Sequence, residues 1–589
     1  MDSGASPLAS GSDTSSDFPV ARLEYTCSRG GRVQKGLISV SKDDIFKVGR
    51  DPRSNDFAVQ SDHESLISRN HCEFYAVVYE PGVNFVYVRD RKSFNGTYVN
   101  GNIIGKGPDI SSGYLLEDGD TIEILPYWKF TFRQQSGPPR IEMNRIQLAE
   151  SRLFSDKYSI TERCIGQGTD ANVYLAHDLV AKRQIVCKVV NLDEYQNRFD
   201  RDGCARKLQE ADILRQLRHP NILPYIESIS SPHSLFIFTE LASGGDLMSF
   251  INRHNGVREF DARIIIRQVV RGLHYLRSKG IIHRDLKPEN ILLAYSPKIA
   301  YHRVMLSDFA TSAVPNRSRM KTVVGTTNYQ APELFGSRSD QTPAIDMWSL
   351  GVVAAIMLTA SLDIGNIIPK LNRLSQDALD QTLKQDILQP CLKLSKNGKT
   401  FVWKCLQISP ETRLTALEAG CHDWLCTPEK HLLFFQQLDQ RILGNWKAPT
   451  ELKPMPIQLP SVLLGPLTKV QDAEAFFKAY SSLSRHYPLV QTEFSQYFRS
   501  EILDSNPNGV VGEKKLPTIA ESTIMKGTPK TTTSSEDSSE ETRTNSTVSS
   551  ENDLPRRHNS DLGIQKRKHP EEGCHNTKRQ VMRRQAKDL

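Results

Sequence analysis

The 589-residue sequence lacks the features of several protein classes. It has no run of eighteen apolar residues, and its nearest approach, LGVVAAIMLTASL at 350–362, is too short to span a bilayer and predicts a buried helix. The N-terminal stretch MDSGASPLASGSDTSSDF has neither a basic start nor an apolar segment, so we expect no secretory signal. These absences predict a protein without a membrane partner.

Cysteine is present but not in pairs. The ten cysteines include no CxxC pair, which argues against a zinc site. Cys421, His422 and Cys426 lie close together, but no second ligand pair stands at a zinc-like spacing. We therefore expect buried or idle thiols and a reducing, intracellular location.

An excess of positive over negative charge is nearly absent outside the C-terminal tail. The formal net charge is +7, and residues 555–589 hold ten Lys/Arg against four Asp/Glu. A basic surface over the whole chain is not supported, so we expect no direct binding of nucleic acid. Within the tail, KRKH at 566–569 and KRQVMRR at 578–584 have the pattern of a two-part nuclear import signal, which predicts a nuclear location. The alternative is a merely solvated basic tail.

Composition and hydrophobic periodicity divide the chain into six segments. Short alternating segments between turn signals such as EPGVN and EDGD predict an all-β sandwich. Strand-like runs (QIVCKVV, SLFIFTEL) and then amphipathic helices (DARIIIRQVVRGLHYLRS) predict a two-lobed α+β domain. The predicted segments are a disordered N-terminus (1–18), the sandwich (20–135), a linker (136–157), the α+β domain (158–425), a helical and Pro-rich extension (426–504) and a disordered tail (505–589).

The helical and Pro-rich extension contains amphipathic stretches, EKHLLFFQQLDQRIL and DAEAFFKAYSSL. Such stretches bury their apolar face against another surface. The sequence leaves open whether that surface is the α+β domain or a partner protein.

A glycine-containing turn stands between the first two strands of the α+β domain. IGQGTDANVYLA at 165–176 places Gly166, Gly168 and Val173 there. Small residues let the backbone close over phosphate groups so that N–H groups meet their oxygens. Ala171 replaces a third glycine and leaves the turn feasible. Two glycines in a β-turn are common, so this signal is weak alone.

Lys188 follows in the strand IVCKVV. Strand alternation puts Val186 and Lys188 on one face, where Val186 can border an adenine ring and Lys188 can reach phosphates. The apolar sequence on both sides argues against an exposed lysine on an edge strand. A buried lysine needs an opposing charge. Glu210, at the start of the helix EADILRQL, is the favoured partner, and Glu194 is the alternative.

The most specific signal is IIHRDLKPENILL at 281–293. Asp285 can accept the proton of an attacking hydroxyl, and Lys287 can neutralise a transferring phosphoryl group. Asn290 can hold Mg²⁺ through its amide oxygen. Phosphoryl transfer needs alignment and charge neutralisation, which these residue types provide.

With these motifs, residues 158–425 resemble a eukaryotic serine/threonine protein kinase domain. The resemblance implies ATP and Mg²⁺ as cofactors, a catalytic role for Lys188 together with Asp285 and Lys287, and Mg²⁺ ligation by Asn290 and Asp308. Glu333 in APE and Arg413 in ETRLTALEA are expected to form a buried ion pair. The implied ATP-binding residues are Ile165, Gly166, Gly168, Val173, Val186, Lys188, Glu210, the gatekeeper Thr239, the hinge residues Glu240 and Ala242, and Asp246, which is a ribose or substrate contact.

One motif departs from the family pattern. Kinases of this type carry Asp-Phe-Gly where this chain has Asp308, Phe309 and Ala310. The chemistry resides in the aspartate, and the glycine contributes backbone freedom. If the position needs a positive φ, alanine costs roughly 1 kcal/mol of strain. We therefore predict a working kinase in which the substitution affects regulation, with an inert kinase-fold scaffold as the alternative.

The segment between these motifs, TSAVPNRSRMKTVVGTTNYQAPE, carries Thr322 and Thr326. The resemblance implies an activation loop in which at least one of them is phosphorylated. Arg284 precedes the catalytic Asp285 and offers a positive partner for a phosphate on Thr322. The alternative is that both threonines only shape the turn.

Three loops of the predicted sandwich, KVGRDPRSNDFAV, LISRNHCEF and SFNGTYVNG, resemble those of a forkhead-associated (FHA) domain. FHA domains bind phosphothreonine peptides, and charge-assisted hydrogen bonds dominate at such a site. Phe94 stands where many relatives have a small or hydroxyl residue, whereas His71 is expected to support the loops from inside the fold. The implied phosphothreonine-binding residues are Arg50, Ser68, Arg69 and Asn95.

An FHA domain followed by a serine/threonine kinase resembles the Chk2-like DNA-damage and meiotic checkpoint kinases of the CAMK group and their fungal relatives. The resemblance implies phosphothreonine-containing partners and Ser/Thr substrates, with Arg at position −3 the expected preference. Only two Ser-Gln sites occur, at Ser375 and Ser495, so a damage role and a meiotic role both stay open. TSSD at Thr14 fits an FHA target, which suggests self-association in trans; a chance match is the alternative.

Overall fold

The computed structural model describes most of the chain between residues 19 and 460. Its internal gaps are residues 30–31, 60–65, 81, 136, 169–170, 195–200, 299–302, 310–311, 313–326, 336–340, 360–374, 383–393, 444–452 and 454. All described residues fall within one compact unit, Met1–Ile524. The disordered segments expected at 1–18 and 505–589 lie outside the described residues.

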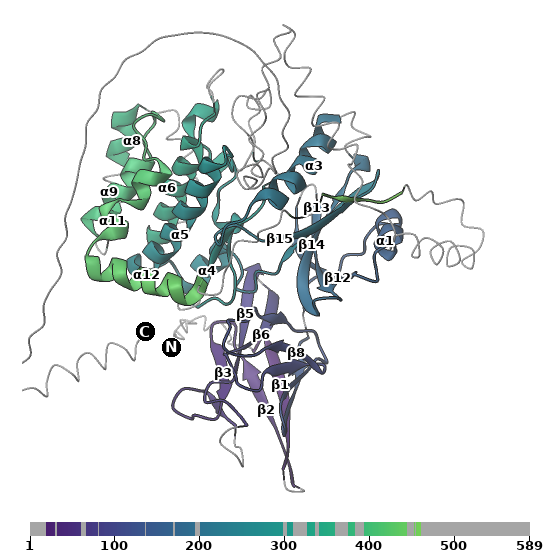
Figure 1. Ribbon diagram of the computed structural model, residues 1–589. Coiled ribbons are helices and arrows are strands. Elements are labelled where there is room, and N and C mark those ends of the chain that lie inside the picture. Colours follow the sequence, from purple (N-terminus) through teal and green to yellow (C-terminus); the bar gives the residue numbers. More distant parts are fainter. Residues whose placement is uncertain are drawn as a thin grey trace, which may run out of the picture. The chain divides into compact units, whose positions relative to one another are not determined.

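The N-terminal part is a sandwich of two mostly antiparallel sheets (Figure 1). The sheets have the strand orders β2-β1-β11-β10-β7-β8 and β4-β3-β5-β6-β9. Side chains alternate along β11, so that Trp128, Phe130 and Phe132 point into a core shared with Phe74 of the other sheet. The strands are β1 (Ala21–Arg29), β2 (Arg32–Val40), β3 (Ile45–Gly49), β4 (Phe57–Ala58), β5 (Cys72–Glu80), β6 (Val83–Asp90), β7 (Thr97–Val99), β8 (Asn102–Gly105), β9 (Tyr114–Leu115), β10 (Thr121–Ile124) and β11 (Trp128–Arg133).

A third sheet begins the α+β region and forms its first lobe. Its strand order is β12-β13-β14-β16-β15-β19, and helix α3 (Arg201–Gln216) contacts β15 and β16. Strand β14 lies between β13 and β16, so Lys188 sits on an inner strand, as its apolar flanks predict. The strands are β12 (Tyr158–Gln167), β13 (Ala171–Asp178), β14 (Arg183–Asn191), β15 (Tyr225–Ser230), β16 (Ser234–Glu240) and β19 (Ile457–Gln458).

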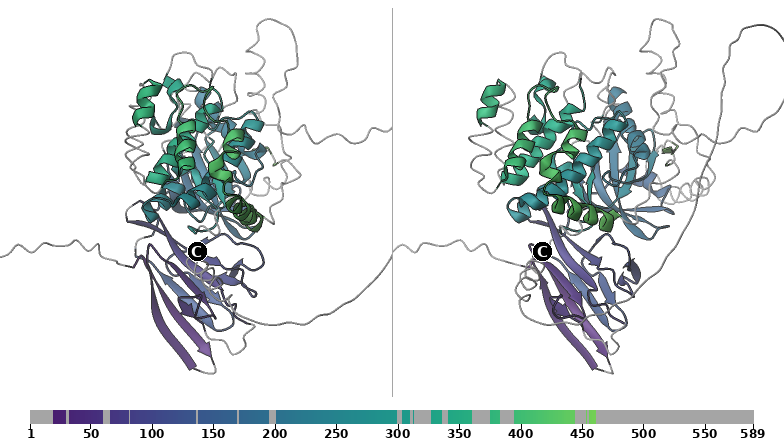
Figure 2. Two further views of the ribbon diagram at one scale, coloured as in Figure 1. Left: turned by 90° about the vertical axis from the view of Figure 1, so that its left-hand side faces the viewer. Right: turned by 60° about the vertical axis from the view of Figure 1, so that its left-hand side comes forward.

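The second lobe is helical (Figure 2, teal and green). Helix α6 is apolar on all sides and is buried from Ile345 to Met357, as the apolar run at 350–362 predicts. The short hairpin β17 (Ile291–Leu293) and β18 (Val304–Leu306) follows the segment HRDLKPEN. The helices are α4 (Leu247–His254), α5 (Glu259–Ser278), α6 (Ala344–Thr359), α8 (Gln376–Thr382), α9 (Lys396–Cys405), α10 (Ala416–Gly420) and α11 (Asp423–Cys426), with 3-10 turns η1 (Pro288–Asn290), η4 (Thr327–Tyr329) and η5 (Pro332–Phe335).

The described part of the extension packs on the α+β domain, which answers the question that the sequence left open. The stretch EKHLLFFQQLDQRIL forms helix α12 (Glu429–Leu443). This helix lies against α5, where Asp439 pairs with Arg267 and Arg271. Strand β19 pairs in parallel with β15 and so extends the first lobe's sheet. The second amphipathic stretch, DAEAFFKAYSSL, lies outside the described residues.

The predicted fold class, a β-sandwich followed by a two-lobed α+β domain, is confirmed. One element was not predicted: helix α1 (Arg145–Arg152) lies within the linker at 136–157. Asn144 starts it with a capping box, in which its side chain accepts from Gln147 N–H at 2.8 Å while Gln147 bonds back. Among the described helices, none has both the length and the apolarity to cross a bilayer.

Candidate active site and phosphate-binding loops

Lys188 stands at the centre of a three-residue charge cluster. Its Nζ lies 2.7 Å from Glu210 Oε1 and 3.0 Å from Asp308 Oδ1. The expected partner Glu210 is therefore in place, while the alternative, Glu194, instead accepts a bond from Asn191. Strand β14, helix α3 and the segment after β18 each contribute one residue, so this contact ties the two lobes together.

The charges in this cluster support one another. Burial alone would lower the pKa of Lys188, but Glu210 and Asp308 outweigh it and raise that pKa above its usual value. Burial raises the pKa of Glu210, and Lys188 opposes this shift. The Lys188 ammonium lowers the pKa of Asp308 to about 2. Asp308 is thus ionised at neutral pH, as a metal-binding carboxylate must be.

The segment HRDLKPEN brings Asp285, Lys287 and Asn290 together. Lys287 Nζ lies 2.9 Å from Asp285 Oδ2, and Asn290 Nδ2 donates to the main-chain oxygen of Asp285 at 2.8 Å and to Oδ2 at 3.1 Å. The 3-10 turn η1 positions Asn290 five residues after Asp285. The sequence predicted these three residues as one group, and the structure brings them within hydrogen-bond distance.

A buried aspartate holds this segment in shape. Asp346, at the start of α6, accepts the backbone N–H groups of His283 and Arg284, each at 2.9 Å. Burial raises the pKa of Asp346, while His283 and the two N–H groups oppose that rise. Arg284 has a φ of 71°, a left-handed conformation that costs a non-glycine residue energy and needs such external support. The sequence did not predict this role, because the contact joins segments about sixty residues apart.

The Asp308 segment is also under backbone strain. Asp308 has a φ of 58°, and the next residue, Phe309, is buried with its ring 5.0 Å from the ring of His283. His283 also bonds the main-chain oxygen of Ser307 at 2.9 Å. Ala310, which stands in place of the family's glycine, lies outside the described residues, so its predicted effect on regulation stays a prediction.

The residues expected around adenine come from adjacent strands. In the sheet, Val173 pairs with Lys188, and Val186 pairs with the buried Thr239. Ile165 and Gly166 lie at the end of β12, and Gly168 N–H donates to Ala171 O at 2.9 Å. Glu240 ends β16, two residues before Ala242. A Cβ added at Gly166 would come no closer than 3.6 Å to Val173, so close packing does not require glycine there.

Asp246 has a structural role that its motif did not reveal. It is the N-cap of α4, where Oδ1 accepts from both the N–H and the hydroxyl of Ser249, each at 2.7 Å. Burial raises its pKa, and these bonds oppose the rise. One of its two carboxylate oxygens is therefore engaged before any ribose or substrate binds. Elsewhere, the expected Arg413–Glu333 pair is present at 2.7 Å.

The residues expected to hold Mg²⁺ suit that ion. Asp308 offers an ionised carboxylate, and the Asn290 amide nitrogen is bound to Asp285, which leaves the amide oxygen as a ligand. Mg²⁺ prefers oxygen ligands, and it is commonly held by one or two protein groups together with substrate phosphates. Among the described residues, no cluster of three or more His, Cys, Asp or Glu side chains forms a complete protein cage for a metal.

At the other end of the described chain, the three FHA-like loops are bonded to one another. Ser68 Oγ accepts the N–H of Phe94 at 2.8 Å, and Asn95 Nδ2 donates to Leu66 O at 2.8 Å. Arg50 N–H donates to Ser68 O at 3.1 Å. The four predicted phosphothreonine-binding residues, Arg50, Ser68, Arg69 and Asn95, thus stand on connected loops.

Two further residues hold these loops. His71 is fully buried, bonds Gly96 O at 3.1 Å and accepts from Ser68 N–H at 3.4 Å, in the supporting role expected for it. Asn55 was missed: its Nδ2 donates to Arg69 O at 2.6 Å and to Asp51 O at 2.8 Å. Phe94 extends from this surface with 75% of its area exposed.

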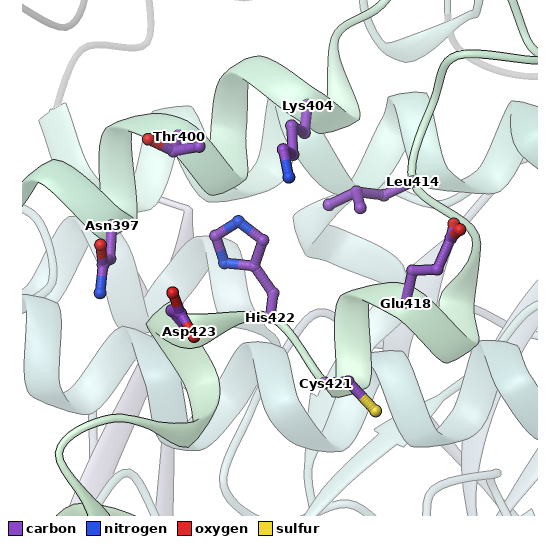
Figure 3. Close-up of a pocket in the computed structure, with 8 residues that line it drawn as sticks. All are labelled: Asn397, Thr400, Lys404, Leu414, Glu418, Cys421, His422 and Asp423. Carbon is purple, nitrogen blue, oxygen red and sulfur yellow. The ribbon is translucent and has the colours of Figure 1, made fainter.

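A shallow pocket of about 390 Å³ lies among α9, α10 and α11 in the helical lobe (Figure 3). His422 and Lys404 point into it, and Glu418 and Asp423 add negative charge. None of the predicted catalytic residues lines it. The lining residues are Asn397, Thr400, Lys404, Leu414, Glu418, Cys421, His422 and Asp423.

Several predicted features fall outside the described residues and stay predictions. These are Thr14, the activation-loop residues Thr322 and Thr326, and the basic tail sequences at 566–569 and 578–584.

Comparison with known proteins matches both regions to families. The protein kinase domain matches residues 159–425, and the FHA domain matches residues 46–125. Among relatives, a meiosis-specific serine/threonine-protein kinase MEK1 of Saccharomyces cerevisiae is 30% identical over 492 residues, which cover 75% of this chain and 92% of that protein. The corresponding mek1 of Schizosaccharomyces pombe is 29% identical over 67% of this chain and 84% of its own length.

A further relative is the serine/threonine-protein kinase RAD53 of Saccharomyces cerevisiae, 27% identical over 70% of this chain and 52% of that protein. Among solved structures, a crystal structure of Rad53 1-466 in complex with AMP-PNP is 25% identical, with a TM-score of 0.37. The match covers 69% of this chain and 100% of that structure's chain. On the two domain matches and the 30% identity with the Saccharomyces cerevisiae MEK1 kinase over 92% of its length, the chain belongs to the FHA-domain-containing serine/threonine protein kinases of the Chk2-like checkpoint type.

Proposed function

We propose that this chain is a catalytically competent kinase that transfers the γ-phosphoryl group of ATP to serine and threonine hydroxyls. The observation that carries the proposal is the intact charge cluster: Lys188 pairs with Glu210 at 2.7 Å and reaches Asp308 at 3.0 Å. A kinase fold that serves only as a scaffold has no need to keep this buried, mutually dependent set of charges.

The residues divide the chemistry among them. Lys188 binds phosphate oxygens of ATP and aligns them, because its ammonium is already fixed by two carboxylates. Asp285 accepts the proton of the substrate hydroxyl as its oxygen bonds to the γ-phosphorus and the bond to the β-phosphate oxygen breaks, which releases ADP. Lys287 neutralises the transferring group. Asn290 and Asp308 would hold Mg²⁺, which would supply further positive charge at the phosphates.

Recruitment occurs through the FHA loops. Arg50 and Arg69 supply cationic donors to a phosphothreonine, Ser68 supplies a hydroxyl, and Asn95 supplies an amide for the peptide backbone. Partners are therefore proteins phosphorylated on threonine. We include in this proposal a second copy of the chain phosphorylated at Thr14, which would align two kinases for trans-phosphorylation.

Activation follows phosphorylation of Thr322 or Thr326. Arg284, next to Asp285, offers the positive charge that such a phosphate needs to order the loop. Preferred substrates carry Arg three residues before the acceptor, and the Asp246 carboxylate is the proposed reader of that arginine. The basic tail directs the protein to the nucleus.

The setting that best fits the relatives is meiosis. Two relatives that match over most of their own length are named meiosis-specific kinases. The test is whether this chain restores meiotic function to yeast cells that lack MEK1, and whether an Asp285→Asn chain fails to do so. Rescue by the Asp285→Asn chain would instead favour the scaffold.

Phosphosite mapping tests activity and regulation together. The purified chain, treated with phosphatase and then incubated with Mg²⁺ and ATP, is expected to gain phosphate on Thr322 or Thr326. The Asp285→Asn chain is the control and should gain none. Equal phosphorylation of both chains would show a contaminating kinase, and no phosphorylation of either would favour an inert phosphothreonine-binding scaffold.

A further inference from the structure

The FHA region is bonded to the helical lobe of the kinase domain. On helix α4, Arg253 donates to Ala76 O at 2.7 Å and to Asp43 O at 2.5 Å. The hydroxyl of the buried Tyr75 donates to Tyr295 O at 2.7 Å. These bonds join β5, and the turn before β3, to the lobe that carries Asp285.

The same region is also bonded to the strand-rich lobe and to the hinge. Gln184, on β14, accepts from Leu115 N–H at 2.7 Å and donates to Leu115 O at 3.0 Å. Between the lobes, Gly113 N–H donates to the hydroxyl of Ser243 at 2.7 Å. A Cβ at Gly113 would lie 3.0 Å from that of Ser243, so the backbone approach is close.

Apolar side chains seal this contact beside the nucleotide site. Tyr75, Val77, Phe85, Tyr87 and Leu115 of the FHA region form one buried cluster with two kinase residues, Leu175 and Leu241. Ile165 and Val186, which are expected over the adenine ring, are packed against this cluster. Movement of one lobe relative to the other would therefore break either the bonds of Gln184 or those of Arg253.

The phosphothreonine-binding loops lie at the other ends of the same strands. Strand β3 runs from Ile45, next to the residues that bind Arg253, to Gly49, next to Arg50. Strand β5 begins after His71 among the phosphate-binding loops and runs toward the kinase contact at Ala76. A phosphopeptide can thus bind without displacing the FHA region from the kinase.

We infer that the FHA domain is an intramolecular brace: it docks across the hinge, bridges both lobes, and holds them at the closure at which Lys188 of the first lobe reaches Asp308 of the second. This goes beyond phosphopeptide recruitment and adds a second role for the FHA domain, support of nucleotide binding. It rests on the proposed function only in that ATP is the nucleotide.

The test uses the full chain and a double variant, Gln184→Ala with Arg253→Glu, that removes one anchor on each lobe. The control is Arg277→Glu, which makes the same charge change at an exposed position of α5. Hydrogen exchange is measured at Gly113 and Leu115, whose N–H groups donate across the contact, and the Kd for Mg²⁺ with AMP-PNP is measured by titration.

In the double variant we expect faster exchange at Gly113 and Leu115, unchanged exchange in β10 and β11, and a Kd for AMP-PNP raised about 5-fold or more. The β10 and β11 amides report that the sandwich itself is still folded. Arg277→Glu should match the wild type.

Unprotected Gly113 and Leu115 amides in the wild type would show that the domain does not dock, and would overturn the brace. So would faster exchange in the double variant with an unchanged Kd. A wild type that binds no AMP-PNP would contradict both the proposed function and the brace's role in ATP binding. The hydrogen exchange at Gly113 and Leu115 would still show whether the FHA domain docks on the kinase domain.

Discussion

Asp346 accepts hydrogen bonds from the backbone N–H groups of His283 and Arg284, each at 2.9 Å. It comes from a helix that begins about sixty residues later in the chain, and it fixes the strained conformation from which Asp285 extends. An aspartate that touches no substrate thereby positions the catalytic base.

Asp346→Asn should therefore reduce catalysis more than nucleotide binding. The amide has one acceptor oxygen for two N–H groups, so the loop shifts, and a misplacement of about 1 Å can cost on the order of 100-fold in rate. We expect kcat to fall roughly 10- to 100-fold and the Kd for AMP-PNP to change little. Asp377→Asn, at an exposed position of α8, is the matched control. Equal losses in both variants would contradict this positioning role.

The Arg413–Glu333 pair predicts a large effect on stability. Arg413 has no exposed side-chain surface, and it also donates to Gln407 O and Ala344 O. Removing one partner leaves the other charge buried, which typically costs about 3–5 kcal/mol. Urea unfolding of Arg413→Ala should show a loss in this range, and the exposed Arg277→Ala should show almost none. A loss below about 1 kcal/mol would show that the pair is not a buried support.

His219 predicts a pH dependence of stability. It stacks on Tyr275 at 4.8 Å, and burial lowers its pKa to about 4, with Arg271 and Arg303 acting in the same direction. Below pH 6.5 the unfolded chain binds a proton that the folded chain does not, so stability falls as the pH falls toward 4. The full shift corresponds to at most about 3 kcal/mol.

The comparison that isolates this effect is the free energy of unfolding at pH 7 and pH 5 for wild type and His219→Gln. The variant should lose less stability between the two pH values than the wild type. His254→Gln, at an exposed position of α4, should keep the wild-type slope. Identical slopes for wild type and His219→Gln would rule out this histidine as a source.

Ser68 predicts a loss confined to phosphopeptide binding. Its Oγ accepts Phe94 N–H and so joins two of the predicted phosphate-binding loops. Ser68→Ala should weaken binding of a peptide phosphorylated at Thr14 by about 10-fold, in line with the loss of a hydrogen bond to a charged group. The Kd for AMP-PNP should not change, and Ser39→Ala, exposed on β2, should bind as the wild type. If the peptide fails to bind even the wild type, the self-association hypothesis is wrong.

The sequence could predict those parts of the site whose residues lie close together in the chain or whose chemistry requires a partner. Alternation along one strand predicted the face that Val186 and Lys188 share, and the need to pair a buried ammonium predicted Glu210. Asp285 and Asn290 lie five residues apart in one segment, so the motif itself predicted that their side chains would be close together.

The parts that could not be predicted depend on contacts between distant segments. The bonds from Arg253 to Asp43 and Ala76 join backbone oxygens to a side chain about two hundred residues away, and backbone acceptors leave no mark in the sequence. Tertiary packing decided these contacts. The cap that Asp246 forms on α4 is different, because it is a local contact to Ser249 and was missed only because Asp246 was considered as a ligand contact.

The most direct test of the central claim is the rate of phosphate transfer from Mg²⁺ and ATP to a peptide with Arg three residues before a single serine. The chain, phosphorylated on its activation loop, should turn over at about 1–100 per second, as protein kinases do. Asp285→Asn should show at least about a 100-fold lower rate with an unchanged Kd for AMP-PNP. Equal rates for the two chains, or no transfer by the wild type in spite of nucleotide binding and loop phosphorylation, would contradict the account.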